Sequence, residues 1–60
     1  MRKLYAFDDE IHASRFTAVL TVNKIEAQVL RNSDDRWDLW IIDEDSIKSA
    51  RGHLERFLND

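Results

Sequence analysis

The sequence contains no cysteine and no proline, and its only glycine is Gly52. Without cysteine the chain can form neither a disulfide framework nor a cysteine-based zinc site, and a secreted chain of 60 residues would often need such a staple. We therefore expect a reducing, cytosolic environment. The single glycine also excludes the glycine-rich loops that hold phosphate groups in nucleotide-binding enzymes.

Long apolar runs and an excess of basic residues are missing as well. Asp8-Asp9-Glu10 interrupts the basic start of the chain before the roughly 7–15 apolar residues of a signal peptide can form, and nothing approaches the ~20 of a membrane span. We expect no direct membrane insertion by this segment. Nine basic against 12 acidic side chains give a net charge of −3, which argues against a nucleic-acid partner because phosphates are bound mainly by clustered lysine and arginine.

The apolar side chains suffice for one small core. We expect residues 1–60 to form a single domain, in which roughly 60% of the unfolded chain's surface can be buried. Much of the apolar area belongs to six aromatic residues, Tyr5, Phe7, Phe16, Trp37, Trp40 and Phe57.

Changes of hydrophobic period predict the first three elements. Residues 2–7 suit a short strand. A helix is expected from about residue 10 to 22, begun by Asp8 or Asp9 and closed at Asn23-Lys24. A strand with one buried face begins near Ile25. The apolar face of the helix is predicted to contain Ile11, Phe16, Val19 and Leu20.

The second half of the chain predicts a hairpin and a second helix. Residues 32–35 form the turn, and the next strand carries apolar residues on both faces, as a central strand does. A helix follows the acidic run at residues 43–45. Its apolar face is predicted to contain Ile47, Ala50, Leu54, Phe57 and Leu58. The order β-α-β-β-α predicts an α+β fold, a three-stranded sheet with two helices packed on one face.

No catalytic motif accompanies this fold. A nucleophile needs an activating base nearby, and the serines, threonines and two histidines form no recognisable arrangement. His12 and His53 invite a zinc hypothesis, but their spacing fits surface positions on two helices better. The acidic run Asp43-Glu44-Asp45 invites a calcium hypothesis, but helix capping explains it with fewer assumptions. We expect no catalytic residue, no metal site and no cofactor.

The central strand leaves one question open. Trp40 and Ile42 cannot share a sheet face with Leu39 and Ile41, because successive side chains in a strand point in opposite directions. With helices on one face only, one of these pairs lies on the open side. Tryptophan there could stack on bases or sugars, although in so small a domain it is usually a core residue.

The run Trp37-Asp38-Leu39-Trp40-Ile41-Ile42-Asp43-Glu44-Asp45, followed by a helix that ends Phe57-Leu58-Asn59, resembles the N-terminal cytoplasmic domain of bacterial rhomboid intramembrane serine proteases. The likeness extends to the apolar positions Ala13, Phe16, Leu20 and Ile25. One departure is Lys24, where family members commonly have glycine, so the helix end requires a cap through Asn23 or a strained Lys24.

The resemblance implies a non-catalytic accessory domain that positions or regulates a membrane protease on the cytoplasmic side of the bacterial inner membrane. The catalytic serine and histidine would lie in transmembrane helices downstream of Asp60, and the first expected partner is that protease domain. A homodimer and an unidentified protein partner stay open. The alternatives are a freestanding protein-interaction module and, third, a small metal-dependent or hydrolytic enzyme.

The resemblance also answers the question of the two faces. Leu39 and Ile41 are similar to family positions that face the helices, which places Asp38, Trp40 and Ile42 outward. We expect these three residues to form an interaction face with Trp40 and Ile42 as its apolar centre and Asp38 as a charged edge. The alternative is that this patch has no binding role and is either covered by the N-terminal segment or left uncovered.

Overall fold

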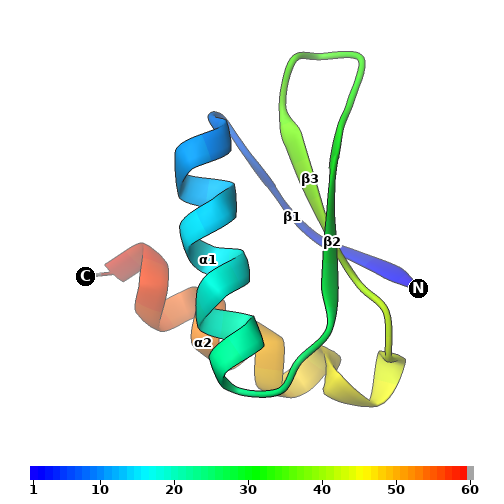
Figure 1. Cartoon of the computed structure of the whole chain (residues 1–60), viewed down its shortest axis with the longest axis vertical. Helices are drawn as coiled ribbons and strands as arrows, with labels where there is room; N and C mark the ends of the chain where they lie inside the picture. The colour runs from blue at the N-terminus through cyan, green and yellow to red at the C-terminus, as the bar shows by residue number, and fades with distance from the viewer. Residues whose placement is uncertain (60) are drawn as a thin grey trace.

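The computed structural model describes residues 1–59, which form a two-layer α+β domain. Figure 1 shows the two helices gathered on one side of the three strands, as predicted. The elements are β1 (Arg2–Phe7), α1 (Glu10–Val22), β2 (Ala27–Arg31), β3 (Trp37–Ile41), a short 3₁₀ turn η1 (Glu44–Ser46) and α2 (Ile47–Asn59).

The strands form an antiparallel sheet in the order β1-β3-β2, so β3 is central, as its two apolar faces predicted. Leu39 of β3 pairs with Tyr5 of β1 and Val29 of β2. The β1 register shifts between Lys3 and Tyr5, which marks a β-bulge on this edge strand. Both outer strands therefore keep one unpaired edge within the described chain.

Both ends of α1 have recognisable caps. Asp9 is the N-cap, and its carboxylate accepts a hydrogen bond of 2.8 Å from the His12 amide. At the other end Lys24 adopts the left-handed conformation, with φ of 61°. The Lys24 amide donates to the Thr21 carbonyl and the Ile25 amide to the Leu20 carbonyl, which is the Schellman pattern. Lys24 thus occupies the position where glycine is usual.

The hairpin turn is organised by Asn32. Its amide donates to the Arg36 carbonyl at 2.8 Å, and its side-chain oxygen accepts from the amides of Asp34 and Arg36. Asp35 is left-handed, with φ of 61°, so the loop is a turn followed by a left-handed residue. Five residues, 32–36, connect β2 to β3; because Asn32 and Arg36 are hydrogen-bonded to each other, only residues 33–35 form the loop itself, and this short loop fixes the register of β2 on β3.

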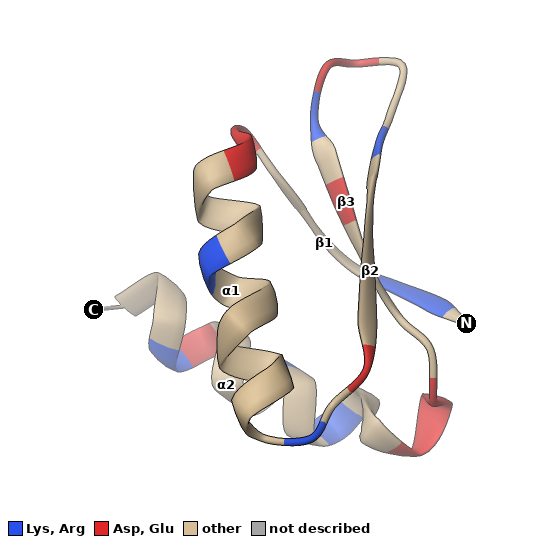
Figure 2. Ribbon diagram, in the orientation of Figure 1, with Lys and Arg blue, Asp and Glu red and all other residues tan. Residues whose placement is uncertain are grey.

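The acidic run before α2 acts at a helix start. Asp43 accepts a hydrogen bond of 3.0 Å from the Asp45 amide and caps η1, which leads directly into α2. Glu44 and Asp45 stand in η1, and Figure 2 shows acidic residues in red at this turn ahead of α2, where a negative charge is favoured by the helix dipole.

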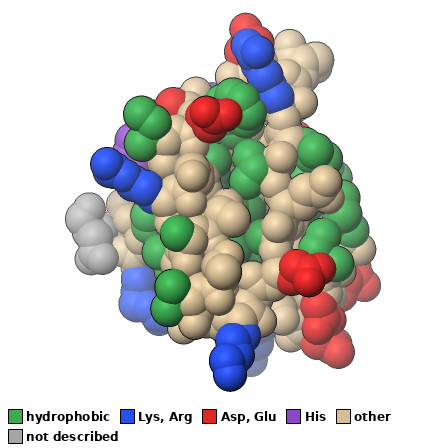
Figure 3. All heavy atoms as spheres, viewed as in Figure 1, with side chains coloured by type: hydrophobic (Ala, Val, Ile, Leu, Met, Phe, Trp, Pro, Cys, Tyr) green, Lys and Arg blue, Asp and Glu red, His purple; other side chains and the backbone are tan. Residues whose placement is uncertain are grey.

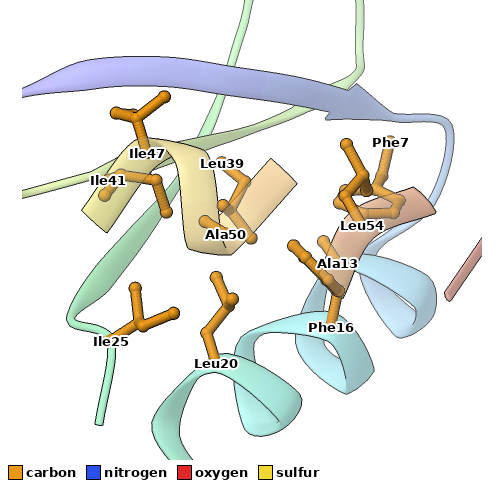
Figure 4. Packing of buried hydrophobic residues seen from close by; sticks show 10 residues of the cluster. All are labelled: Phe7, Ala13, Phe16, Leu20, Ile25, Leu39, Ile41, Ile47, Ala50 and Leu54. Atoms are coloured by element: carbon orange, nitrogen blue, oxygen red, sulfur yellow. The ribbon is translucent and has the colours of Figure 1, made fainter. Parts of the chain in front are cut away.

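A single core lies between the sheet and the helices (Figure 4). Phe16 and Leu20 of α1 and Leu39 and Ile41 of β3 are fully buried. The complete buried cluster is Phe7, Ala13, Phe16, Leu20, Ile25, Leu39, Ile41, Ile47, Ala50 and Leu54.

Two predicted core positions were wrong. Ile11 is 63% exposed and Leu58 is 49% exposed. Ile11 lies about 200° around the helix from Ala13, at 100° per residue, and therefore faces solvent. Leu58 belongs to the last turn of α2, beyond Leu54, the last buried residue of that helix, and keeps about half of its surface exposed. Phe57 is partly buried against Phe7 and Phe16.

Of the helices that the structure describes, none combines the length and the apolar character needed to cross a membrane.

Candidate interaction surface

The two faces of β3 have different environments. Leu39 and Ile41 point into the core and have 0% exposed surface. Asp38 and Trp40 alternate with them and therefore point away from the helices. The Ile42 amide donates to the Glu26 carbonyl at 3.2 Å, which continues the ladder and places the Ile42 side chain on the Trp40 side.

Neighbouring strands complete this open side of the sheet. Residues paired directly across an antiparallel ladder share a face. We call the resulting surface the open face; it consists of Lys3 and Ala6 from β1, Gln28 and Leu30 from β2, and Asp38, Trp40 and Ile42. Leu30 and Ile42 are 42% and 36% exposed, and Trp40 is half-buried. The open face is therefore an apolar surface with polar side chains set among its members.

Asp38 lies in the middle of the open face and not at a charged edge as predicted. It is only 8% exposed, between Ala6 on β1 and Leu30 on β2. The Asn32 side-chain amide donates to its carboxylate at 2.9 Å, and the Lys3 ammonium lies 3.8 Å away. A buried carboxylate is tolerated only when it is hydrogen-bonded and paired, and Asp38 meets both conditions.

Asn32 links the hairpin turn to the open face. Its side-chain oxygen holds the turn while its side-chain NH₂ group holds Asp38, so one residue orders both features. Sequence reasoning assigned Asn32 only to the turn. It also missed Lys3 and Leu30, although the alternation Ala27, Val29 against Leu30 was visible in the sequence and indicated an outward Leu30.

The predicted candidates for chemistry lie apart from this surface. Nδ1 of His12 lies 2.8 Å from both carboxylate oxygens of Asp9, and His53 contacts Arg56 within α2. The hydroxyls of Thr17 and Thr21 donate to carbonyls one helical turn back. Within residues 1–59 no three metal-ligating side chains come together.

The pKa of Asp9 is lowered below its ordinary value of 3.8, first by the hydrogen bond from the His12 amide and next by the bond from the His12 side chain. Both bonds are made to the charged carboxylate, and they stabilise it relative to the protonated form. Because the pair lies at the exposed start of α1, its effect is on helix capping.

Comparisons with protein-family models, with curated proteins and with solved structures give no match for this chain. The features of this chain that bear on function are therefore the residues of the open face and the motif that crosses β3.

Proposed function

We propose that this chain is a non-catalytic accessory domain of a rhomboid-family intramembrane serine protease. In this role the domain lies on the cytoplasmic side of the membrane and contacts the membrane-embedded protease through the open face. The supporting observation is the coincidence of two features on one strand. The motif at residues 37–45 that resembles the family runs through β3 and η1, and the same strand carries the outward Trp40.

The open face suits a weak contact between tethered parts. It is amphipathic, with Leu30 and Ile42 exposed and Trp40 half-buried beside polar groups, as in interfaces that form and separate. A short tether gives an effective concentration on the order of millimolar, so a small surface is sufficient to maintain contact within one protein. The Lys3 ammonium is half-exposed beside these apolar residues, and a charge at such a position affects the orientation of a partner more than the affinity.

A freestanding protein-interaction module is the second candidate. The observation that favours it is the self-contained fold of residues 1–59, in which caps and core are completed by residues of this segment alone. In that role the open face would bind a separate protein or a second copy of the chain.

The coding sequence after Asp60 distinguishes the two candidates. The accessory-domain proposal expects a proline-containing linker followed by several stretches of ~20 apolar residues, one with a serine and another with a histidine. A stop codon directly after Asp60 would eliminate the accessory domain and leave the freestanding module. In the longer protein, removal of residues 1–60 should leave catalytic serine chemistry intact and change the location or the regulation of cleavage.

A further inference from the structure

An open groove of about 690 Å³ runs between α1 and β2, on a different side of the molecule from the open face. In the space-filling view of Figure 3, hydrophobic side chains are visible in a hollow between these two elements. Val29 and Trp37 contribute apolar surface from the sheet, and small side chains of α1 line the opposite side. The complete lining is Glu10, Ser14, Thr17, Ala18, Thr21, Val22, Val29 and Trp37.

The outer edge of β2 offers backbone hydrogen-bonding groups along this groove. The bonds from the Ile42 amide to Glu26 and from the Asn32 amide to Arg36 show which residues of β2 exchange hydrogen bonds with β3. In an antiparallel ladder such residues alternate, so the N–H and C=O groups of Ala27, Val29 and Arg31 point away from β3. A strand edge of this kind is a template for another strand.

The same three residues direct their side chains to the helix-covered side of the sheet. Ala27 pairs with Ile41 and Val29 with Leu39, both buried beneath the helices. A strand added to β2 would therefore place every second side chain against α1 and the wall of the groove. Those alternate side chains must be apolar and of moderate size, because Ala18 and Thr21 face them.

The charge of Glu10 indicates which residues a bound segment carries at one of its ends. Glu10 is the only charged residue among those that line the groove, and it has no ion-pair partner within the described residues. Arg31 at the same end lies over the Trp37 ring, and its guanidinium is paired with the Asp35 carboxylate at 2.7 Å. It stands at the start of α1, near the end of β2, because α1 and β2 run in opposite directions along the groove (Figure 1). A strand antiparallel to β2 enters at this end, so its first residues meet the Glu10 carboxylate.

We propose that the groove binds an extended peptide segment of a partner protein, which adds to β2 as an antiparallel strand. The segment carries lysine or arginine at its start and apolar side chains at alternate positions after it. Backbone bonds to Ala27, Val29 and Arg31 supply affinity, and the groove supplies selectivity for the alternate side chains. This inference does not depend on the proposed function, since the two surfaces share no lining residue.

The test uses a fluorescent synthetic peptide of sequence Lys-Lys-Thr-Val-Thr-Val-Thr and the chain of residues 1–60. Titration should give saturable binding by fluorescence anisotropy, with amide NMR shifts concentrated at residues 27–31 and 14–22. The matched control peptide is N-methylated at alternate residues whose N–H groups would face β2, and it should bind at least tenfold more weakly.

Two matched protein variants test the site itself. Ala18→Lys places bulk and positive charge in the groove from an exposed helix position, and Ile11→Lys makes the same change of charge at an exposed position outside it. The first variant should weaken peptide binding at least tenfold and the second less than twofold. Glu10→Gln should weaken binding severalfold for this peptide and not for one in which threonine replaces both lysines.

Several results would overturn the proposal. The peptide would fail to show saturable binding at millimolar concentration, or the N-methylated peptide would bind as tightly as the unmodified one. Alternatively, the NMR shifts would be confined to the open face, or two copies of the chain would pair through β2 and the peptide would not bind there. If Ala18→Lys does not fold, the N-methylated peptide still decides the outcome on the unmodified chain. Substitutions on the open face should leave peptide binding in the groove unchanged, so a failure of the groove proposal and a failure of the proposed function can be told apart.

Discussion

The covered and open faces of the sheet differ in what their apolar side chains do. On the covered face Leu39 and Ile41 are fully buried by the helices, and their burial stabilises the domain. On the open face Trp40 and Ile42 retain exposed surface around the polar centre at Asp38. Adjacent residues of one strand therefore differ in their role: Leu39 and Ile41 stabilise the fold, while Trp40 and Ile42 are left available for the contacts proposed above, because a strand divides its side chains between two faces.

The largest expected effect belongs to the covered face. Leu39→Ala should lower the free energy of unfolding by roughly 2–5 kcal/mol, because it removes fully buried methyl groups and the surrounding core relaxes only partly into the cavity. Ile42→Ala on the open face should cost less than about 1 kcal/mol. Urea unfolding followed by tryptophan fluorescence measures both. Equal costs for the two variants would remove the distinction between the faces.

Asp38 should show the next largest effect, since it is the buried polar residue of the open face. Asp38→Ala leaves the Asn32 NH₂ group without its acceptor, at an expected cost of about 1–3 kcal/mol. Lys3→Met should cost less than about 0.5 kcal/mol, because the Lys3 side chain is half-exposed and its nitrogen lies 3.8 Å from the carboxylate. If Lys3→Met proves the more costly change, the ion pair and not the Asn32 bond holds Asp38 in place.

Lys24→Gly should stabilise the domain, by about 1 kcal/mol or less. Glycine relieves the left-handed backbone at φ of 61°, and the greater entropy of unfolded glycine offsets part of that gain. Gly52→Ala is a matched comparison in α2, because a Cβ there meets only the Arg56 side chain at 3.9 Å and should also stabilise. A lower melting temperature for Lys24→Gly would contradict the Schellman assignment at the end of α1.

The smallest effect concerns the start of α1 at low pH. Because the folded-state pKa of Asp9 is lowered, its contribution to stability is present above the unfolded value of 3.8 and is lost as pH falls through the folded value. The difference in urea midpoint between the unmodified chain and Asp9→Ala should therefore be constant above about pH 5 and shrink below it. Asp9→Asn retains a capping acceptor that does not titrate, so its difference from Asp9→Ala should not shrink in this way.

The sequence predicted the elements well because their signals are local. Alternation identified β3 as central, Asp9 and Asn23-Lys24 bounded α1, and the acidic run preceded α2. Ile11 and Leu58 were wrongly predicted to be buried. A helical period does not reveal where the sheet ends or which side of the first helical turn the sheet covers.

The candidate site was only partly predictable. The outward position of Trp40 follows from alternation once the covered face is known, but the burial of Asp38 depends on Asn32, whose side chain reaches it across the hairpin. The groove beside β2 depends on how α1 lies against the sheet, and no local pattern encodes that placement. Tertiary packing decides these features.

In the role proposed above, the open face makes contacts that the fold does not need. The most direct test is the double change Trp40→Ser with Ile42→Thr, measured by thermal unfolding and by binding of the domain to the membrane-embedded protease that we propose as its partner. Ile11→Thr, at an exposed residue of α1 outside both the open face and the groove, is the control. We predict a melting temperature lowered by no more than about 8 °C, equivalent to about 1 kcal/mol, and binding weakened at least tenfold. Unfolding of the domain would contradict the outward placement of Trp40 and Ile42, and unchanged binding would contradict the proposed role of the open face.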